Sequence, residues 1–116
     1  ALMGMGALAS VAAQKPNNLS IIILDNAHFG ETGMQLSHTA HGVELAEVAA
    51  ACGFNSSQTI IDYESLDAFS NALNVKNGPS LVVIKITADN PDRSLPNLDG
   101  VHIKNRFRSS LGIQPI

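Results

Sequence analysis

The fold class is decided by residues 20–26, SIIILDN, and by residues 81–86, LVVIKI. Each stretch is a run of aliphatic and β-branched residues with almost no polar interruption. Runs of this kind, without apolar and polar alternation, are typical of strands that are covered on both faces, as in parallel sheets. We therefore predict two long buried strands, with helices packed on both faces of the sheet that contains them.

Segments with helical spacing of apolar residues alternate with these strands. The predicted helices are residues 2–14, 43–52, 65–75 and 101–111, and the predicted strands are residues 20–24, 58–61 and 81–86. We expect Gly53 to end the second helix and Ser65 to cap the third, whose inward residues should be Leu66, Phe69, Ala72 and Leu73. This alternation predicts an α/β fold with three layers, α/β/α, and a mainly parallel sheet formed by residues 1–116 as one domain.

Composition excludes several classes of protein. The 116 residues carry a net charge of −3, which argues against a general nucleic-acid or anionic-membrane binder. The single cysteine, Cys52, excludes a scaffold built on internal disulfides, and we expect it to be a packing residue. Residues 1–13 look superficially like the apolar part of a secretory signal, but no basic region precedes them. We interpret them as a core helix whose beginning has been cut off.

Polar residues follow directly after the first predicted strand. In open α/β sheets ligands bind beyond the carboxyl ends of the strands, where Asp25, Asn26 and a long loop rich in Gly, Thr and His stand. Oxygen atoms of Asn side chains and of the backbone are ligands suited to Mg²⁺ or Ca²⁺. The alternative is that the pair only shapes a turn. His38 and His41 invite a catalytic role, but two histidines with scattered acids do not form a zinc set.

The chain resembles the diphosphate-binding half of thiamine diphosphate enzymes. The resemblance rests on LMGMGALASVAAQKPNNL, on LDN followed by GETGMQ and SHTA, on LAEVAAACGF and on GPSLVVIKI. The family motif runs from Gly-Asp-Gly to a closing Asn-Asn or Asp-Asn, so Asp25-Asn26 would close it. Its opening half would lie immediately before Ala1 and is absent from this chain. Within the family, the sulfopyruvate and phosphonopyruvate decarboxylases are the most similar.

The resemblance implies which residues form the site. Asn26 would bind Mg²⁺ through its side-chain oxygen and His28 through its backbone carbonyl, whereas Asp25 would make a structural hydrogen bond. Glu31 is the only acid of the loop and is a candidate proton carrier or water-orienting group, with a solvated loop carboxylate as the alternative. The implied contacts to thiamine diphosphate are Asn26, His28, Phe29, Gly30 and Thr32.

The implied reaction is the decarboxylation of a small anionic 2-oxo acid to an aldehyde and CO₂. The activating glutamate of the family belongs to a pyrimidine-binding domain or α subunit, so we expect an oligomeric cytoplasmic enzyme whose C-terminal portion is inactive alone. The basic segment 102–108 would meet an acidic partner or the anionic substrate, or would be a solvated helix face. The alternatives are an acetolactate synthase-like carboligase and a non-catalytic domain of flavodoxin-like layout. Neither a nucleic acid nor a membrane is expected as a partner.

Overall fold

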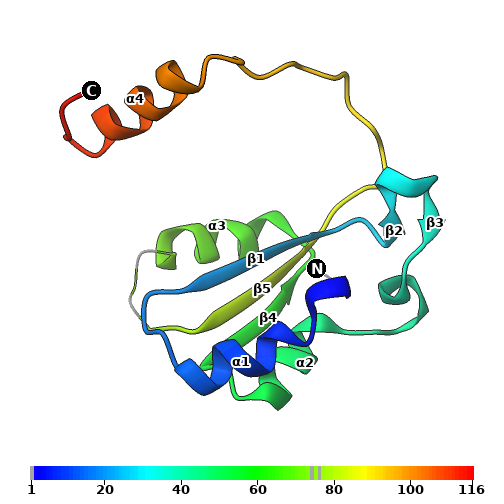
Figure 1. Cartoon of the computed structure of the whole chain (residues 1–116). Helices are drawn as coiled ribbons and strands as arrows, with labels where there is room; N and C mark the ends of the chain where they lie inside the picture. The colour runs from blue at the N-terminus through cyan, green and yellow to red at the C-terminus, as the bar shows by residue number, and fades with distance from the viewer. Residues whose placement is uncertain (1, 74, 76) are drawn as a thin grey trace.

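The chain folds around a three-stranded parallel sheet in a computed structural model that describes residues 2–73, 75 and 77–116. The strands are β1 (Ser20–Asp25), β4 (Ser56–Ile60) and β5 (Ser80–Lys85), and their order in the sheet is β1-β5-β4. Helices α1 (Ala7–Gln14) and α2 (Leu45–Cys52) cover one face, and α3 (Tyr63–Ala72) lies on the other, as Figure 1 shows. The predicted three-layer α/β/α fold with a parallel sheet is confirmed.

The central strand β5 carries the core. Leu81 and Val83 are almost completely buried and pack with Leu8 and Ala12 of α1 and with α2. The side chain of Ala49 on α2 is fully buried, because a small residue lets the helix approach the sheet closely. Val82 points to the opposite face and is also buried, so β5 is the strand that fits the prediction of cover on both sides.

Strand β1 differs from the prediction. Ile21 and Ile23 are half-buried, but Ile22 and Leu24 on the other face are 44% and 64% exposed. Cover of residues 20–24 on both faces is therefore wrong for this structure. The reason is position: β1 is an edge strand, and α3 is the single described helix on the face that carries Ile22 and Leu24.

Three predicted helix starts are also wrong, and one of them is that of α2, which begins at Leu45 instead of residue 43. Residues 2–14 do not form one helix, because a 3₁₀ turn, η1 (Leu2–Gly4), precedes α1, and the glycines in this region disfavour a continuous helix. Helix α3 begins two residues before Ser65, because the Asp62 carboxylate accepts a hydrogen bond from the Ser65 backbone N–H at 2.8 Å and so provides the cap. The predicted stop of α2 at Gly53 is confirmed, with φ 99°.

The inward face of α3 is narrower than predicted. Leu66 and Phe69 are half-buried, but Ala72 and Leu73 are exposed. The predicted end of this helix at residue 75 is also late, since α3 ends at Ala72; residue 74 lies outside the described residues.

The long loop after β1 contains short regular elements that sequence patterns do not show. They are the hairpin strands β2 (His28–Phe29) and β3 (Gln35–Leu36) and the 3₁₀ turns η2 (Gly30–Thr32) and η3 (His38–His41). Residues 87–99 are irregular and lead to α4 (Gly100–Ser110), which stands apart from the sheet (Figure 1). None of the helices in the described part of the chain is long and apolar enough to cross a membrane.

Candidate functional site

The candidate site lies at the carboxyl end of β1, where Asp25 joins three segments of the chain. Its Oδ1 accepts hydrogen bonds from the Ala27 backbone N–H at 2.9 Å and from the Thr39 hydroxyl at 2.7 Å. Its Oδ2 accepts one from Lys85 Nζ at 2.8 Å, also an ion pair. The carboxylate thus fastens the turn after β1, the 3₁₀ turn η3 and the end of β5 to one another. Asp25 thus makes structural hydrogen bonds, of the kind that the family resemblance implied for it.

The charge of Asp25 is stabilised by these partners. Burial raises the pKa of this carboxyl, but the hydrogen bonds from Lys85, Thr39 and Ala27, with the positive charge of Lys85, together hold the pKa below its usual value. Ser37 extends the arrangement, because its buried hydroxyl lies 2.7 Å from the Thr39 hydroxyl. Since Thr39 uses its proton toward Asp25, Ser37 is the donor of that bond.

The turn of residues 26–28 directs oxygen atoms away from the hairpin. Asn26 Oδ1 accepts from the His28 backbone N–H at 3.0 Å, and His28 Nδ1 donates to the Asn26 carbonyl at 2.7 Å. His28 pairs with Leu36 in the β2–β3 ladder, at a position that carries no backbone hydrogen bond between the two strands. The hydrogen-bonded positions lie on either side of it: the Ser37 N–H donates to the Ala27 carbonyl before it, and the next bonded position is at Phe29. In an antiparallel ladder the N–H and C=O of such a residue point away from the partner strand. The His28 carbonyl therefore lies on the same side of β2 as the Asn26 side chain.

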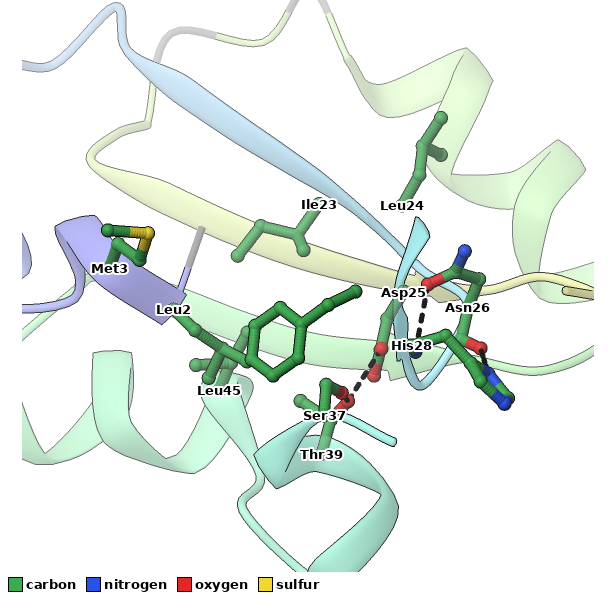
Figure 2. Close-up of a pocket in the computed structure, with 11 residues that line it drawn as sticks. Leu2, Met3, Ile23, Leu24, Asp25, Asn26, His28, Ser37, Thr39 and Leu45 are labelled. Carbon is green, nitrogen blue, oxygen red and sulfur yellow. Dashed lines mark hydrogen bonds between the residues drawn. The ribbon is translucent and has the colours of Figure 1, made fainter. Parts of the chain in front are cut away.

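A pocket opens beside this turn. Its volume is about 230 Å³, and Figure 2 shows its lining, in which the polar side chains of Asp25, Asn26, Ser37 and Thr39 lie near an apolar wall. The lining residues are Leu2, Met3, Ile23, Leu24, Asp25, Asn26, His28, Phe29, Ser37, Thr39 and Leu45. The pocket is thus built from the start of the chain, the end of β1, the hairpin and the turn before α2, which are far apart in sequence.

The structure brings together only part of the predicted site. Asn26, His28 and Phe29 line the pocket, whereas Gly30, Glu31 and Thr32 form the exposed turn η2 at the far end of the hairpin. The Thr32 hydroxyl donates to Gln35 Oε1 at 3.2 Å and so closes the hairpin. Any contact of η2 with a bound ligand would therefore come from outside the pocket wall.

Three residues at the site were missed by the sequence analysis: Ser37, Thr39 and Lys85. Ser37 and Thr39 belong to SHTA, a stretch that carries the family resemblance but does not by itself indicate a role for either side chain. The sequence does contain an indication for Lys85, because it is the one charged residue in an apolar strand. In a parallel sheet the carboxyl end of that strand lies next to Asp25. Only the register, which pairs Lys85 with Asp25, makes that indication specific.

Other candidates stand outside the pocket. The exposed His38 packs edge-on against Phe29, with ring centroids 6.0 Å apart, and His41 is exposed. Cys52 is half-buried against the core, which agrees with a packing role. Among the residues that the structure describes, no three His, Cys, Asp or Glu side chains are grouped so that they could hold a metal ion.

The donor chemistry of the pocket fits Mg²⁺ held jointly with a phosphate ligand. Asn26 Oδ1 keeps a second lone pair beside its bond to the His28 N–H, and the His28 carbonyl lies on the same side. Mg²⁺ prefers six oxygen ligands and is usually held by a few protein groups together with phosphate and water. Two neutral oxygen donors are too few for a Mg²⁺ site made of protein groups alone, but they suit a site in which phosphate and water supply the other ligands.

Fold and site together define a class: a parallel α/β domain with a polar ligand pocket beyond the carboxyl edge of its sheet. No protein-family model matches the sequence. Sulfopyruvate decarboxylase subunit beta of Methanocaldococcus jannaschii is 31% identical over 110 residues, which cover 95% of this chain and 58% of that protein. The corresponding subunit of Methanothermobacter thermautotrophicus is 35% identical over 91% of this chain and 54% of its own length.

A phosphonopyruvate decarboxylase gives a similar result. The enzyme of Streptomyces viridochromogenes is 34% identical over 98% of this chain, which corresponds to 29% of its own length. The chain thus spans a little over half of the beta subunits that it matches and less than a third of the longer decarboxylase. The chain is a homologue of these sulfopyruvate and phosphonopyruvate decarboxylases over nearly its whole length, and the likeness to these decarboxylases inferred from the sequence is confirmed.

Proposed function

We propose that this chain is the Mg²⁺- and thiamine diphosphate-binding portion of a 2-oxo acid decarboxylase, which converts a small anionic 2-oxo acid to an aldehyde and CO₂. The observation that carries the proposal is the turn after β1, where Asn26 Oδ1 and the His28 carbonyl face the same side next to a pocket. Homology over nearly the whole chain to two named decarboxylases supports the reaction class.

In this proposal the chain binds and orients, and the cofactor performs the bond cleavage. When bound, thiamine diphosphate would supply the electron sink that takes up the electron pair left on the substrate as CO₂ departs. Asn26 and His28 would hold Mg²⁺ through their oxygen atoms, and the ion would link the diphosphate to the turn. The buried Leu45 and the half-buried Phe29 and Leu2 give the pocket an apolar wall that would limit the access of water to a bound cofactor. Gly30 and Thr32 would approach the diphosphate from the loop.

We propose that Glu31, although it lies outside the pocket wall, approaches a bound substrate from the loop side and takes part in proton transfer to or from it. It lies on η2, which continues directly from the pocket residues His28 and Phe29, and its carboxylate is exposed. A group that acts only on the substrate should affect turnover and leave cofactor affinity unchanged. We therefore expect Glu31→Gln to lower kcat by about 10²- to 10⁴-fold while thiamine diphosphate binding stays as in the wild type.

We also propose that the site is completed by a pyrimidine-binding domain or α subunit in an oligomer that works in the cytoplasm. Two of the relatives described above are named as beta subunits, which for them means a partner chain. Helix α4 suits contact with an acidic partner, because Lys104, Arg106 and Arg108 are its charged residues and it stands apart from the sheet (Figure 1). No residue of α4, which the structure describes in full, lines the pocket, and the helix lies away from the β2–β3 hairpin in Figure 1, which favours an acidic partner over the anionic substrate as the group that it meets.

The test is a calorimetric titration of the complete gene product, with its partner subunit where one exists. Thiamine diphosphate is titrated with and without Mg²⁺ into the wild type, Asn26→Ala, Asn26→Asp and the control Asn90→Ala, whose residue is exposed in the loop of residues 87–99. We expect Mg²⁺-dependent binding that is lost in Asn26→Ala and kept in Asn26→Asp and in Asn90→Ala, because only the first removes an oxygen ligand.

A second assay addresses the substrate. CO₂ release is measured from sulfopyruvate, phosphonopyruvate and pyruvate, and the product is analysed for an aldehyde or for a condensed acetohydroxy acid. An aldehyde supports the decarboxylase, whereas a condensed product would indicate a carboligase. No binding of thiamine diphosphate by the assembled protein, with or without Mg²⁺, would contradict the enzyme proposal and leave a binding domain.

A further inference from the structure

The end of β5 places a cation against the buried carboxylate of Asp25. The parallel register pairs Lys85 with Asp25, and Lys85 Nζ lies 2.8 Å from Asp25 Oδ2 and 4.0 Å from Glu44 Oε2. The Asp25 side chain is 7% exposed and that of Lys85 is 32% exposed. Lys85 therefore reaches inward from the rim of the site and neutralises a carboxylate that solvent hardly touches.

The two oxygen atoms of Asp25 have different partners. Oδ2 faces Lys85, and Oδ1 accepts from the Ala27 N–H and the Thr39 hydroxyl. A carboxylate is a rigid plane, so the bond at Oδ2 fixes the direction in which Oδ1 points. Lys85 thereby controls the orientation of the atom that holds the turn of residues 25–28.

That turn contains a backbone conformation that needs to be held. Ala27 has φ 60°, in the left-handed region that residues with a Cβ seldom adopt. Its N–H bonds to Asp25 Oδ1 at 2.9 Å, and its carbonyl accepts from the Ser37 N–H at 2.8 Å. These bonds, one at each side of Ala27, keep Asn26 and His28 in the relative positions that put their oxygen atoms on one side.

We infer that Lys85 is a positioning residue for metal binding: through Asp25 it holds the strained Ala27 turn, and so aligns Asn26 Oδ1 with the His28 carbonyl. This inference rests on the proposed function, because it concerns the Mg²⁺ site of that proposal. Lys85 does not itself contact the metal or the cofactor. Groups that orient metal ligands in this way change metal affinity by about 10- to 100-fold when they are removed.

The test uses the complete gene product and two readouts. The first is the Mg²⁺ concentration that gives half-maximal binding of thiamine diphosphate, and the second is the urea midpoint of unfolding. We compare Lys85→Met, which keeps length and loses charge, Lys85→Arg, which keeps charge, and the control Lys15→Met, whose lysine is exposed at the end of α1. We expect the half-maximal Mg²⁺ concentration to rise about 10- to 100-fold in Lys85→Met and less than about threefold in the other two.

A purely structural role would lower the urea midpoint of Lys85→Met without moving the Mg²⁺ dependence of the folded protein, and that result would overturn the inference. Action through Asp25 is tested by adding Lys85→Met to Asp25→Asn, whose amide oxygen can still accept from Ala27. We expect Asp25→Asn itself to weaken Mg²⁺-dependent binding, and the second substitution to add less than about a threefold effect, since its target is gone.

If Lys85→Met alone fails to fold, the inference can still be tested by comparing Asp25→Asn with the double variant Asp25→Asn/Lys85→Met. Wild-type affinity in Asp25→Asn, or a clear difference between Asp25→Asn and the double variant, would then overturn the inference. The failure of the proposed function looks different: the wild type itself would show no Mg²⁺-dependent binding of thiamine diphosphate, whatever residue 85 is. Wild-type binding that depends on Asn26 but not on Lys85 would keep the proposed function and overturn only this inference.

Discussion

At the scale of single residues, Thr39 shows how a hydroxyl can hold a site together. Its side chain donates to the buried Asp25 carboxylate at 2.7 Å and accepts from Ser37 at the same distance. We expect Thr39→Val, which has the same shape without the hydroxyl, to lower the free energy of unfolding by about 1.5–3 kcal/mol, the range for a lost hydrogen bond to a charged group. Urea unfolding measures this, with Thr39→Ser as the control that keeps the hydroxyl. Equal stability of the valine and serine variants would contradict the prediction.

Gly78 is a residue whose missing side chain is required by its surroundings. A Cβ added there would lie 2.6 Å from the Leu19 carbonyl oxygen and 2.9 Å from that of Pro16. The obstacles are backbone atoms, so relief needs a movement of the chain between α1 and β1. We expect Gly78→Ala to lower the free energy of unfolding by about 1–3 kcal/mol or more. Thermal unfolding of Gly78→Ala beside Gly4→Ala, where a Cβ meets nothing within 4 Å, tests this.

At the scale of secondary-structure elements, α3 depends on its cap. The Asp62 carboxylate accepts from the Ser65 backbone N–H at 2.8 Å and from the Ser65 hydroxyl at 3.0 Å, and these bonds lower the pKa of Asp62. A carboxyl whose pKa is lower in the folded state stabilises the fold above its unfolded pKa, and loses this effect as the pH falls through its folded pKa. The stability from the cap should therefore fade below about pH 4.

Two substitutions separate the cap from its charge. Asp62→Asn keeps a good capping side chain without an acid and should unfold at nearly the same urea concentration as the wild type at neutral pH. Between pH 4 and pH 2 it should lose less stability than the wild type. Asp62→Ala should lower the urea midpoint at neutral pH, and Asp67→Ala on the same helix serves as the control. A steeper loss for Asp62→Asn than for the wild type in acid would contradict the assignment.

The edge strand β1 was the element least predictable from its own residues. Its sequence is as apolar as that of β5, yet Ile22 and Leu24 are exposed and Val82 is buried. Local sequence reports which residues favour a buried strand, but the number of neighbours depends on where the strand lies in the sheet. The existence of β1 and its parallel pairing with β5 were thus predictable from the sequence, whereas the exposure of the face that carries Ile22 and Leu24 was not.

At the scale of the whole molecule, charge is divided along the chain. The segment of residues 100–116 contains three basic residues and no acid, so it carries +3, and because the whole chain carries −3 the rest carries −6. Helix α4 lies outside the folded layers in Figure 1, and its bonds run to the last residues of the chain, as from Lys104 Nζ to the Ile116 carbonyl. The negative charge therefore lies on the acidic body, residues 1–99, and the positive charge lies on the basic arm, residues 100–116, which is set apart from the layers of the fold.

This separation predicts the effect of removing the arm. Deletion of residues 100–116 from the complete gene product should change the free energy of unfolding by less than about 0.5 kcal/mol, because the deleted part packs on none of the sheet layers. Association with a partner subunit, measured by sedimentation at 50 and 300 mM salt, should weaken and lose much of its salt dependence. A loss of stability of about 2 kcal/mol or more would mean that the arm packs on the body.

The sequence by itself determined the α/β class, the parallel pairing of its two apolar strands, the glycine end of α2 and the position of Asp25-Asn26 beyond the first strand. These follow from periodicity and from the conformational freedom of glycine, which act over a few residues. Its likeness to the decarboxylases also gave Asn26, His28 and Phe29, which line the pocket.

Only the tertiary structure decided which side chains complete the site. Lys85 is 60 positions from Asp25 and Thr39 is 14 positions away, and both contacts exist because the parallel register and the hairpin bring the ends of distant segments together. It also separated Glu31 from the pocket, since the hairpin carries η2 outward. Spacing along a chain constrains neighbours within an element, whereas contacts between elements are set by how layers pack, and that is why these residues emerged only from the folded protein.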